Sequence, residues 1–167
     1  SASDGQRLQL HATQVREKQR DFSICVSPLY NSEHNEIDPI KFIEWVELSR
    51  QLGAKHITLY DFHVSDAIRH ILHHYSELGV ISVVAWPLPQ QYDEAMWYHG
   101  QLVAIQGCLY RNMGSTKYLA MNDIDEFMVP HMYHDWSEFV GAVDNDNTCG
   151  FQFNSAFFDK LFLSITF

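Results

Sequence analysis

The sequence is organised around the stretch Tyr118-Leu-Ala-Met-Asn-Asp-Ile-Asp-Glu-Phe-Met-Val-Pro130. Its first four residues predict a buried strand, and three carboxylates follow within four residues, namely Asp123, Asp125 and Glu126. Like charges this close repel one another unless a cation or hydrogen-bond donors neutralise them. Mg²⁺ and Mn²⁺ take oxygen ligands and often share them with substrate phosphates. We therefore predict that this Asp-x-Asp motif, at the carboxyl end of a strand, holds a divalent metal and a diphosphate.

A short Asp-x-Asp motif also occurs in solvated acidic turns and in helix caps. Here apolar residues flank the motif on both sides, with Tyr118-Leu-Ala-Met121 before it and Phe127-Met-Val-Pro130 after it. Such flanks predict that the segment is buried, and a buried group of carboxylates requires a counter-ion. For this reason we favour the metal site over the solvated turn.

Outward from this stretch, strand and helix patterns alternate along the chain. Short apolar or β-branched runs predict strands at residues 22–26, 56–60, 80–86, 118–121 and 150–153. Helical spacing and capping residues predict helices at residues 39–52, 66–78, 93–112 and 135–143. Asp38 and Ser65 are the expected N-caps of the first two helices, and Gly53 and Gly79 end them.

The sequence also predicts where the first strand ends, how deeply the third strand is buried and which face of the first helix is apolar. Ser27-Pro28 is expected to end the first strand. The run from Val80 to Trp86 is nearly continuously apolar, which is typical of a strand buried on both faces. The expected apolar face of the first helix comprises Ile40, Ile43, Val46 and Leu52.

Alternating strands and helices with short connections predict an α/β fold with a doubly wound, mostly parallel sheet. Ligands of such sheets bind beyond the carboxyl ends of the strands, where the strand order switches. The candidate ligand-binding residues are therefore those that follow the strands: Ser27, Pro28, Tyr30, Asp61, His63, Trp86, Pro87, Asp123, Asp125 and Glu126. An acid after the second strand suits a ribose, and the acids after the fourth suit a metal-bound diphosphate. The sequence contains neither a Gly-x-Gly-x-x-Gly fingerprint after the first strand nor a Gly-Lys-Ser/Thr phosphate loop.

Composition narrows the class of protein further. The chain has 167 residues, 46% of them hydrophobic, and a formal net charge of −10. This length fits one domain with a substantial core. The negative charge disfavours nucleic acid and anionic membranes as partners, and no apolar run reaches the ~18 residues of a membrane span.

The cysteine and histidine residues give only weak evidence for disulfide bonds or metal sites. Cys25, Cys108 and Cys149 are too few for a disulfide scaffold, and the sequence leaves open whether any two of them pair. The run containing His70, His73 and His74 predicts a solvated helical face rather than a metal site, and residues 144–148 predict a polar turn rather than a calcium loop.

Several blocks of sequence, in this order, resemble glycosyltransferase family 92. These blocks are Cys25-Val-Ser-Pro-Leu-Tyr30, Gly53-Ala-Lys-His-Ile-Thr-Leu-Tyr-Asp61, Val83-Val-Ala-Trp86, Gly100-Gln-Leu-Val-Ala104, Cys108-Leu-Tyr-Arg111 and Asp123-Ile-Asp-Glu-Phe-Met-Val-Pro130. The resemblance covers residue 22 to about residue 159. It implies a nucleotide-sugar-binding domain of the GT-A type.

The resemblance also implies an activity, a cofactor and a location. The expected reaction is transfer of a hexose, galactose from UDP-galactose, to a glycan acceptor with inversion, using Mn²⁺ or Mg²⁺. Asp125 and Asp123 match the metal and diphosphate positions, and Asp61 matches an acidic position that contacts the nucleoside. Together with Pro28 and Tyr30 at the end of the first strand, they make up the expected donor site. Members of the family are usually Golgi proteins that face the lumen from one N-terminal membrane anchor, and no such anchor is visible in this chain.

The expected organisation is a flexible lead-in (1–21), a donor-binding domain (22–159) and an atypical apolar tail (160–167). The acceptor-binding segments and the general base that an inverting transfer needs are expected beyond residue 159, so no catalytic residue is assigned. An alternative is a non-catalytic remnant that binds nucleotide sugars or glycans. We also expect the apolar residues near the C-terminus to lack cover and to lower the solubility of the chain.

Overall fold

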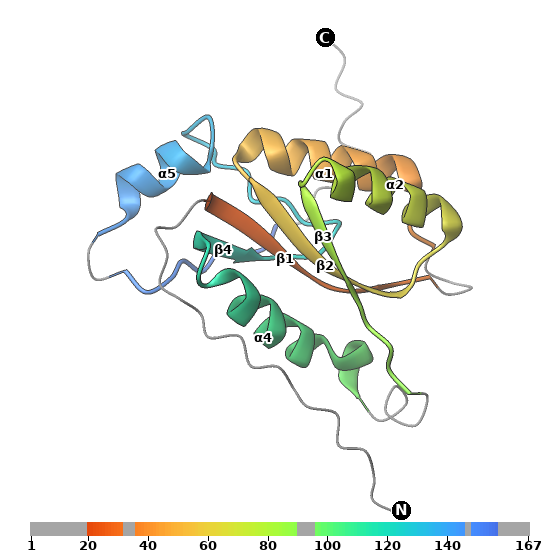
Figure 1. Cartoon of the computed structure of the whole chain (residues 1–167). Helices are drawn as coiled ribbons and strands as arrows, with labels where there is room; N and C mark the ends of the chain where they lie inside the picture. The colour runs from red at the N-terminus through yellow and green to blue at the C-terminus, as the bar shows by residue number, and fades with distance from the viewer. Residues whose placement is uncertain (1–19, 32–35, 90–95, 146–147, 157–167) are drawn as a thin grey trace, which may run out of the picture.

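The computed structural model describes residues 20–31, 36–89, 96–145 and 148–156. Four strands form one sheet in the order β3-β2-β1-β4, and each neighbouring pair is parallel (Figure 1). The strands are β1 Arg20–Tyr30, β2 His56–His63, β3 Ile81–Ala85 and β4 Thr116–Met121. The predicted α/β class with a parallel sheet is therefore confirmed.

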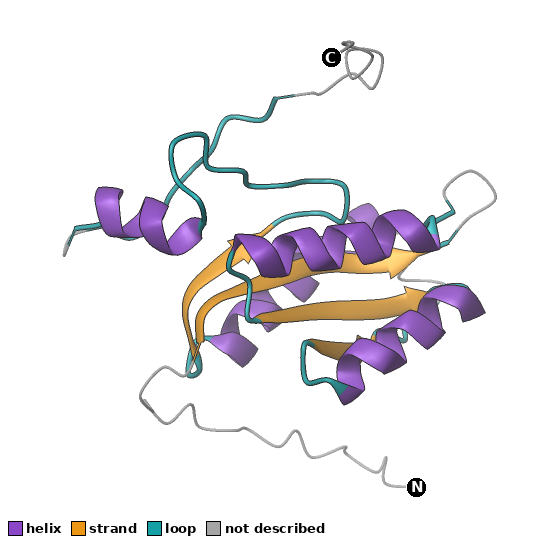
Figure 2. Cartoon of the chain, turned by 90° about the horizontal axis from the view of Figure 1, so that it is seen from above, coloured by secondary structure: helices purple, strands orange, loops and turns teal. Residues whose placement is uncertain are grey.

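Helices cover both faces of this sheet and run roughly along the strands (Figures 1 and 2). The helices are α1 Pro39–Leu52, α2 Asp66–Glu77, α4 Gln101–Asn112 and α5 Trp136–Val143, and a 3₁₀ turn, η1 Trp97–Gly100, precedes α4. Helices α1 and α2 lie on one face, and α4 lies on the other (Figure 1). The chain thus forms a three-layered, Rossmann-like arrangement.

The strand order explains why α4 changes face. From β1 the chain moves outward to β2 and β3 with α1 and α2 on one face, and it then returns past β1 to β4. Crossover connections between parallel strands keep one hand, so a reversal of direction puts the next helix on the opposite face. The order therefore switches between β1 and β4, and the carboxyl ends of these two strands flank the crevice where such sheets bind ligands.

Alternation along β1 separates the two core layers. Phe22, Ile24 and Val26 belong to the large cluster that packs under α1 and α2. Cys25 belongs to a smaller cluster on the opposite face, with Tyr60 of β2 and Ala104 and Cys108 of α4. Cys25 and Cys108 form a disulfide with a Cα–Cα distance of 6.0 Å, a pairing that the sequence left open.

The helix caps agree with the sequence. Asp38 accepts hydrogen bonds from the backbone N–H groups of Ile40 and Lys41, and Ser65 accepts one from that of Ile68. Gly53 follows α1 with φ of 126°, a conformation that residues with a Cβ rarely adopt.

The first strand is longer than predicted. It begins two residues earlier, at Arg20, and continues through Ser27-Pro28 to Tyr30 instead of ending there. Val26 and Ser27 face the single residue Leu59 of β2, which makes a β-bulge. Since a bulge tolerates the missing N–H of a proline, Pro28 does not end the strand.

The predicted burial patterns of α1 and β3 were partly wrong. Ile40 and Ile43 of α1 are exposed, and its buried positions are Phe42, Trp45, Val46, Ser49 and Leu52. Because β3 pairs on one side only among the described residues, just Ile81 of that strand is fully buried, and the strand is not covered on both faces. Position in the sheet, which the local pattern does not encode, decided this difference.

Two further elements, both in the C-terminal half of the chain, differ from the prediction. The helix expected at residues 93–112 starts only at Gln101, because Tyr98 and His99 have positive φ; residues 93–95 lie outside the described ranges. Residues 150–153 form no strand. Instead, Phe151 and Phe153 pack against Phe139 of α5, with ring centroids 6.0 and 5.8 Å away, which satisfies the apolar alternation without a sheet.

Candidate functional site

A polar pocket lies between the carboxyl ends of β1 and β4, at the switch in strand order. Its volume is about 100 Å³. The lining residues are Cys25, Ser27, Gln101, Ile105, Met121, Asn122, Asp123 and Glu126. The pocket therefore takes its walls from β1, from the start of α4 and from the acidic segment after β4, in agreement with the predicted location of a ligand site.

Hydrogen bonds within the acidic segment hold it in a compact turn. The N–H of Glu126 donates to the carbonyl of Asp123 (3.1 Å), and the N–H of Asp123 donates to the Glu126 carboxylate (3.0 Å). The indole of Trp45, in α1, and the side-chain amide of Asn122 each donate to the Glu126 carbonyl at 3.1 Å. This turn places Asp123 and Glu126 along the pocket, whereas the exposed Asp125 is not among the lining residues.

The segment is less buried than its apolar flanks suggested. β4 has only one fully buried residue, Thr116, and Phe127 and Val129 are exposed. The acids therefore remain accessible to solvent, and exposure lowers the repulsion among them. Burial of the motif on both sides was a wrong prediction, although its position at the strand end was right.

The pocket offers oxygen donors that fit a hard divalent cation. Asp123 and Glu126 supply carboxylates, and the buried amide oxygen of Asn122 accepts no hydrogen bond from any described residue. Mg²⁺ and Mn²⁺ favour such a set and complete their coordination with water and phosphate oxygens. Within the described ranges, however, no three His, Cys, Asp or Glu side chains are grouped closely enough to bind a metal by themselves. A ligand would have to supply the remaining oxygens.

Pro28 and Tyr30 lie in the last three residues of β1. Pro28 is buried and faces Tyr60 of β2. The ring of Tyr30 contacts that of His99, with centroids 4.1 Å apart, and His99 also contacts Phe62 at 4.9 Å. Tyr30, His99 and Phe62 therefore form an aromatic group at the carboxyl ends of β1 and β2.

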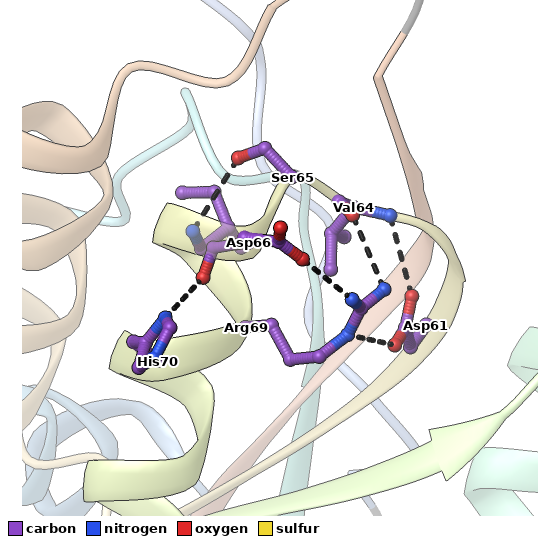
Figure 3. Close-up of polar contacts among 7 residues, drawn as sticks. Asp61, Val64, Ser65, Asp66, Arg69 and His70 are labelled. Atoms are coloured by element: carbon purple, nitrogen blue, oxygen red, sulfur yellow. Dashed lines mark hydrogen bonds and ion pairs between the residues drawn. The ribbon is translucent and has the colours of Figure 1, made fainter.

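Asp61 is engaged in the connection between β2 and α2 (Figure 3). Its carboxylate accepts a hydrogen bond from the N–H of Val64 (3.3 Å) and lies 3.8 Å from Nε of Arg69. Arg69 also pairs with Asp66 at 2.9 Å and donates to the carbonyl of Val64. Asp61 is thus separate from the pocket that holds Asp123, and in this structure its carboxylate stabilises a turn.

The sequence did not predict two amide side chains of the pocket, those of Gln101 and Asn122. Gln101 donates from Nε2 to the hydroxyl of Ser27 at 2.8 Å, and Asn122 supplies the buried amide oxygen. Asn122 stands directly before the acids, so its place at a strand end was a usable signal. Gln101 could be found only through the crossing of α4 over β1, 74 residues away.

A larger hollow of about 390 Å³ lies at the opposite end of the sheet, where β1 and β4 begin beside α5. The hydroxyl of Tyr118 donates to Asp144 there, and this hydrogen bond holds the pKa of the Asp144 carboxyl below its usual value. Ligands of open parallel sheets bind at the carboxyl ends of the strands. We therefore take the smaller pocket as the candidate site.

The remaining predictions concern histidine and the acidic loop after α5. His70, His73 and His74 are exposed on α2, as expected for a solvated helical face. Thr148 donates from its N–H to the Asn145 carbonyl and accepts from the Asn145 N–H, which fits the predicted polar turn. The predicted apolar tail at residues 160–167 and most of the predicted lead-in lie outside the described residues.

The fold and the pocket define a Rossmann-like α/β protein with a candidate ligand site at its switch point. The model of glycosyltransferase family 92 matches residues 20–162, and the chain belongs to this family. The chain is similar to beta-1,4-galactosyltransferase galt-1 of Caenorhabditis elegans, with 37% identity over 110 residues that cover 65% of this chain and 25% of the relative.

Two plant proteins are also similar to this chain. They are the galactan beta-1,4-galactosyltransferases GALS2 and GALS3 of Arabidopsis thaliana, each 26% identical over 71% of this chain. These matches cover 22% and 23% of the two relatives, so the chain spans about a quarter of the length of the curated relatives it matches. Across the described ranges, no helix has the length and apolar character needed to cross a membrane.

Proposed function

We propose that this chain supplies the donor site of a metal-dependent galactosyltransferase that uses UDP-galactose. The observation that carries the proposal is the pocket at the β1–β4 switch point, lined by Asp123 and Glu126, in a member of glycosyltransferase family 92. The three similar proteins described above are all named beta-1,4-galactosyltransferases, which supports galactose as the transferred sugar. A chain of net charge −10 repels a diphosphate, so a divalent cation is the natural bridge between the two.

Each predicted site residue has a role in this proposal. Asp123 and Asp125 hold Mn²⁺ or Mg²⁺, with Glu126 and Asn122 beside them. The bound ion would act as a Lewis acid toward the departing diphosphate. Asp61, Pro28 and Tyr30 contact the nucleoside at the ends of β1 and β2.

The rest of the reaction follows from the family resemblance alone. The acceptor is a glycan, the transfer inverts the anomeric centre, and the enzyme works at the lumenal side of the Golgi membrane. An inverting transfer needs a base to take the proton from the acceptor hydroxyl. None of the pocket residues is assigned that role.

Thermal unfolding with Mn²⁺ and UDP tests the donor site without requiring turnover. At a ligand concentration of about 100 Kd, binding to the native state adds ~2.7 kcal/mol of stability, or roughly 5–10 °C in Tm for a domain of this size. Asp123→Asn and Asp125→Asn are each expected to remove most of this shift. Glu44→Gln, at an exposed position on α1, is the matched control and should keep it.

The results of this experiment distinguish a wrongly assigned metal site from a wrongly proposed function. If neither variant reduces the shift, the metal lies elsewhere in the chain. If the wild-type chain shows no shift at all, the donor-site proposal fails. Replacing UDP with UDP-galactose and then with UDP-glucose tests the sugar, and we expect the galactose donor to give the larger shift.

A further inference from the structure

The start of α4 is held in an unusual and costly backbone conformation. Tyr98 and His99 have φ of 44° and 52°, and Gly100 follows with φ of 79°. Positive φ is uncommon for residues with a Cβ, because it crowds the side chain against the backbone. Three such residues in a row turn the chain sharply, so that α4 begins at Gln101.

Side chains from the sheet fix this turn in place. The indole of Trp86 donates to the carbonyl of His99 at 2.8 Å, and the His99 ring lies against Tyr30 of β1. Gly100 is buried, and a Cβ there would lie 3.4 Å from the Trp86 ring. As N-cap of α4, Gly100 has no side chain that could cap the helix.

The other end of α4 is anchored as well. The disulfide Cys25–Cys108 joins the helix to β1, and Asn112 donates to the hydroxyl of Thr58 in β2 at 3.1 Å. Contacts at both ends leave α4 little freedom to slide along the sheet. Such support is what a side chain needs in order to be held in one orientation within a site.

These anchors place the side chain of Gln101 in the pocket. Its Nε2 donates to Oγ of Ser27, which stands in the bulge of β1. The amide oxygen of Asn122, which also lines the pocket, has no hydrogen-bond donor among the described residues. Asn122 is only 9% exposed, so this unpaired oxygen is expensive unless a ligand satisfies it.

The pocket therefore presents uncharged hydrogen-bonding groups beside its two carboxylates. Hydroxyl groups both donate and accept, so they can satisfy the Asn122 oxygen and the Gln101 amide together. The pocket, about 100 Å³, is smaller than the roughly 300–1,000 Å³ of a typical small-molecule site, so it can receive part of one ring rather than a whole nucleotide sugar.

We propose that Gln101 is a positioning residue that hydrogen-bonds a ring hydroxyl of the bound donor, with Asn122 on the other side of the same hydroxyl-bearing edge. This inference rests on the proposed function, and it adds the chemical group of the donor, a ring hydroxyl, that the pocket residues would bind. The hydroxyl belongs either to the ribose or to the hexose, and the two sources are separated by the choice of ligand.

The test is calorimetric titration of the whole chain with UDP, UDP-galactose and 2′- and 3′-deoxy-UDP in the presence of Mn²⁺. Gln101→Met keeps the length of the side chain and removes its amide, and is expected to weaken binding about tenfold. Gln106→Ala, at an exposed position of the same helix, is the matched control and should bind as the wild type does. A melting curve of each variant verifies folding, and if Gln101→Met is unfolded, the loss on removing one ring hydroxyl from the ligand is measured on the wild type instead.

A ribose contact predicts equal weakening for UDP and UDP-galactose, and no difference between variant and wild type for one deoxy analogue. A hexose contact predicts weakening for UDP-galactose only. The inference is overturned if Gln101→Met binds every ligand as tightly as the wild type, or if it weakens all of them alike, deoxy analogues included, since that pattern reports a structural role. The wild-type fallback uses the two deoxy-UDP analogues and UDP-galactose analogues that lack one hexose hydroxyl, and the inference is overturned if all of them bind as tightly as the parent ligands. Absence of UDP binding by the wild type would overturn the proposed function and this inference with it.

Discussion

At the scale of single residues, the acidic segment shows how a cluster of like charges is tolerated. Asp125 points toward solvent at the tip of the turn, and Glu126 receives a hydrogen bond from the N–H of Asp123. Backbone donors and water thus neutralise part of the charge, and a cation is needed only to join the segment to an anionic ligand. Hydrogen bonds from Trp45 and Asn122 hold the backbone of this turn in place.

Asp61 can be tested separately from the acidic segment. If its carboxylate contacts the nucleoside as proposed, Asp61→Ala should weaken UDP binding by about 1.5–3 kcal/mol, the range for hydrogen bonds to charged groups. Arg69→Ala is the control, because it removes the guanidinium beside Asp61 and keeps the carboxylate. Titration calorimetry measures both. Unchanged affinity in Asp61→Ala would restrict this residue to the turn shown in Figure 3.

His56 should make stability depend on pH. Its Nδ1 lies 3.2 Å from the Gly79 carbonyl, which can only accept, so Nδ1 carries the proton and the Ser82 hydroxyl donates to Nε2. Burial, and secondarily the charge of Arg20, lowers the pKa of His56. Below the unfolded value of about 6.5, the unfolded chain binds a proton that the folded chain does not. The free energy of unfolding should therefore fall as pH drops through and below about 6.5.

Urea unfolding between pH 8 and pH 5 measures this effect. His56→Gln should flatten the dependence, whereas His73→Gln, on the exposed face of α2, should leave it as in the wild type. Equal slopes for wild type and His56→Gln would show that other groups cause the pH dependence.

At the scale of elements, α4 differs from the other helices in how it is attached. Helices α1 and α2 are positioned by the large apolar cluster and begin with side-chain caps. α4 begins without a side-chain cap and packs through a small cluster that contains the disulfide. Covalent and polar anchors thus replace a broad apolar face on this side of the sheet.

The disulfide should therefore contribute much of the stability of this layer. Cys25→Ala/Cys108→Ala is expected to lower the free energy of unfolding by about 2–4 kcal/mol, since the bridge joins residues 83 apart in sequence. Denaturant unfolding with and without a reductant measures it. The reductant should destabilise the wild type and leave the double variant unchanged; an equal effect on both would assign the loss to something other than this bridge.

At the scale of the whole molecule, the outer face of α4 is unusually apolar for a chain with a net charge of −10. Leu102 is 71% exposed, Tyr110 62% and Met113 46%, and Leu109 lies on the same side of the helix. Several exposed apolar side chains on one helix face often mark a contact with other protein or a tendency to aggregate. The solubility problem expected from the C-terminal residues thus has a second source within the described structure.

We expect the chain to self-associate through this face. Leu102→Gln/Met113→Gln should lower the apparent mass in light scattering and leave the free energy of unfolding within ~0.5 kcal/mol of the wild type, as surface substitutions do. Ile40→Gln, at a residue 69% exposed on α1, is the matched control and should not change the association. A wild-type chain that stays monomeric in the same measurement contradicts this prediction.

Local sequence was sufficient for the alternation of elements, for the N-caps Asp38 and Ser65, and for the place of Asp123 at the end of a strand. These features depend on residues within one or two turns of the chain, so their physical causes can be read directly from the sequence. Blocks of sequence resembling glycosyltransferase family 92 likewise pointed to the family that the comparison established.

Tertiary structure alone decided which strand lies at an edge, which residues face the pocket, and which cysteines pair. The exposure of β3, the hydrogen bond between Gln101 and Ser27 and the Cys25–Cys108 bridge all depend on the order β3-β2-β1-β4 and on the passage of α4 across β1. These contacts join residues 74 and 83 positions apart, and their formation follows from the packing of whole layers. No local propensity encodes that packing, and for this reason the sequence predicted the edge of the sheet where the site lies but not the set of side chains that meet there.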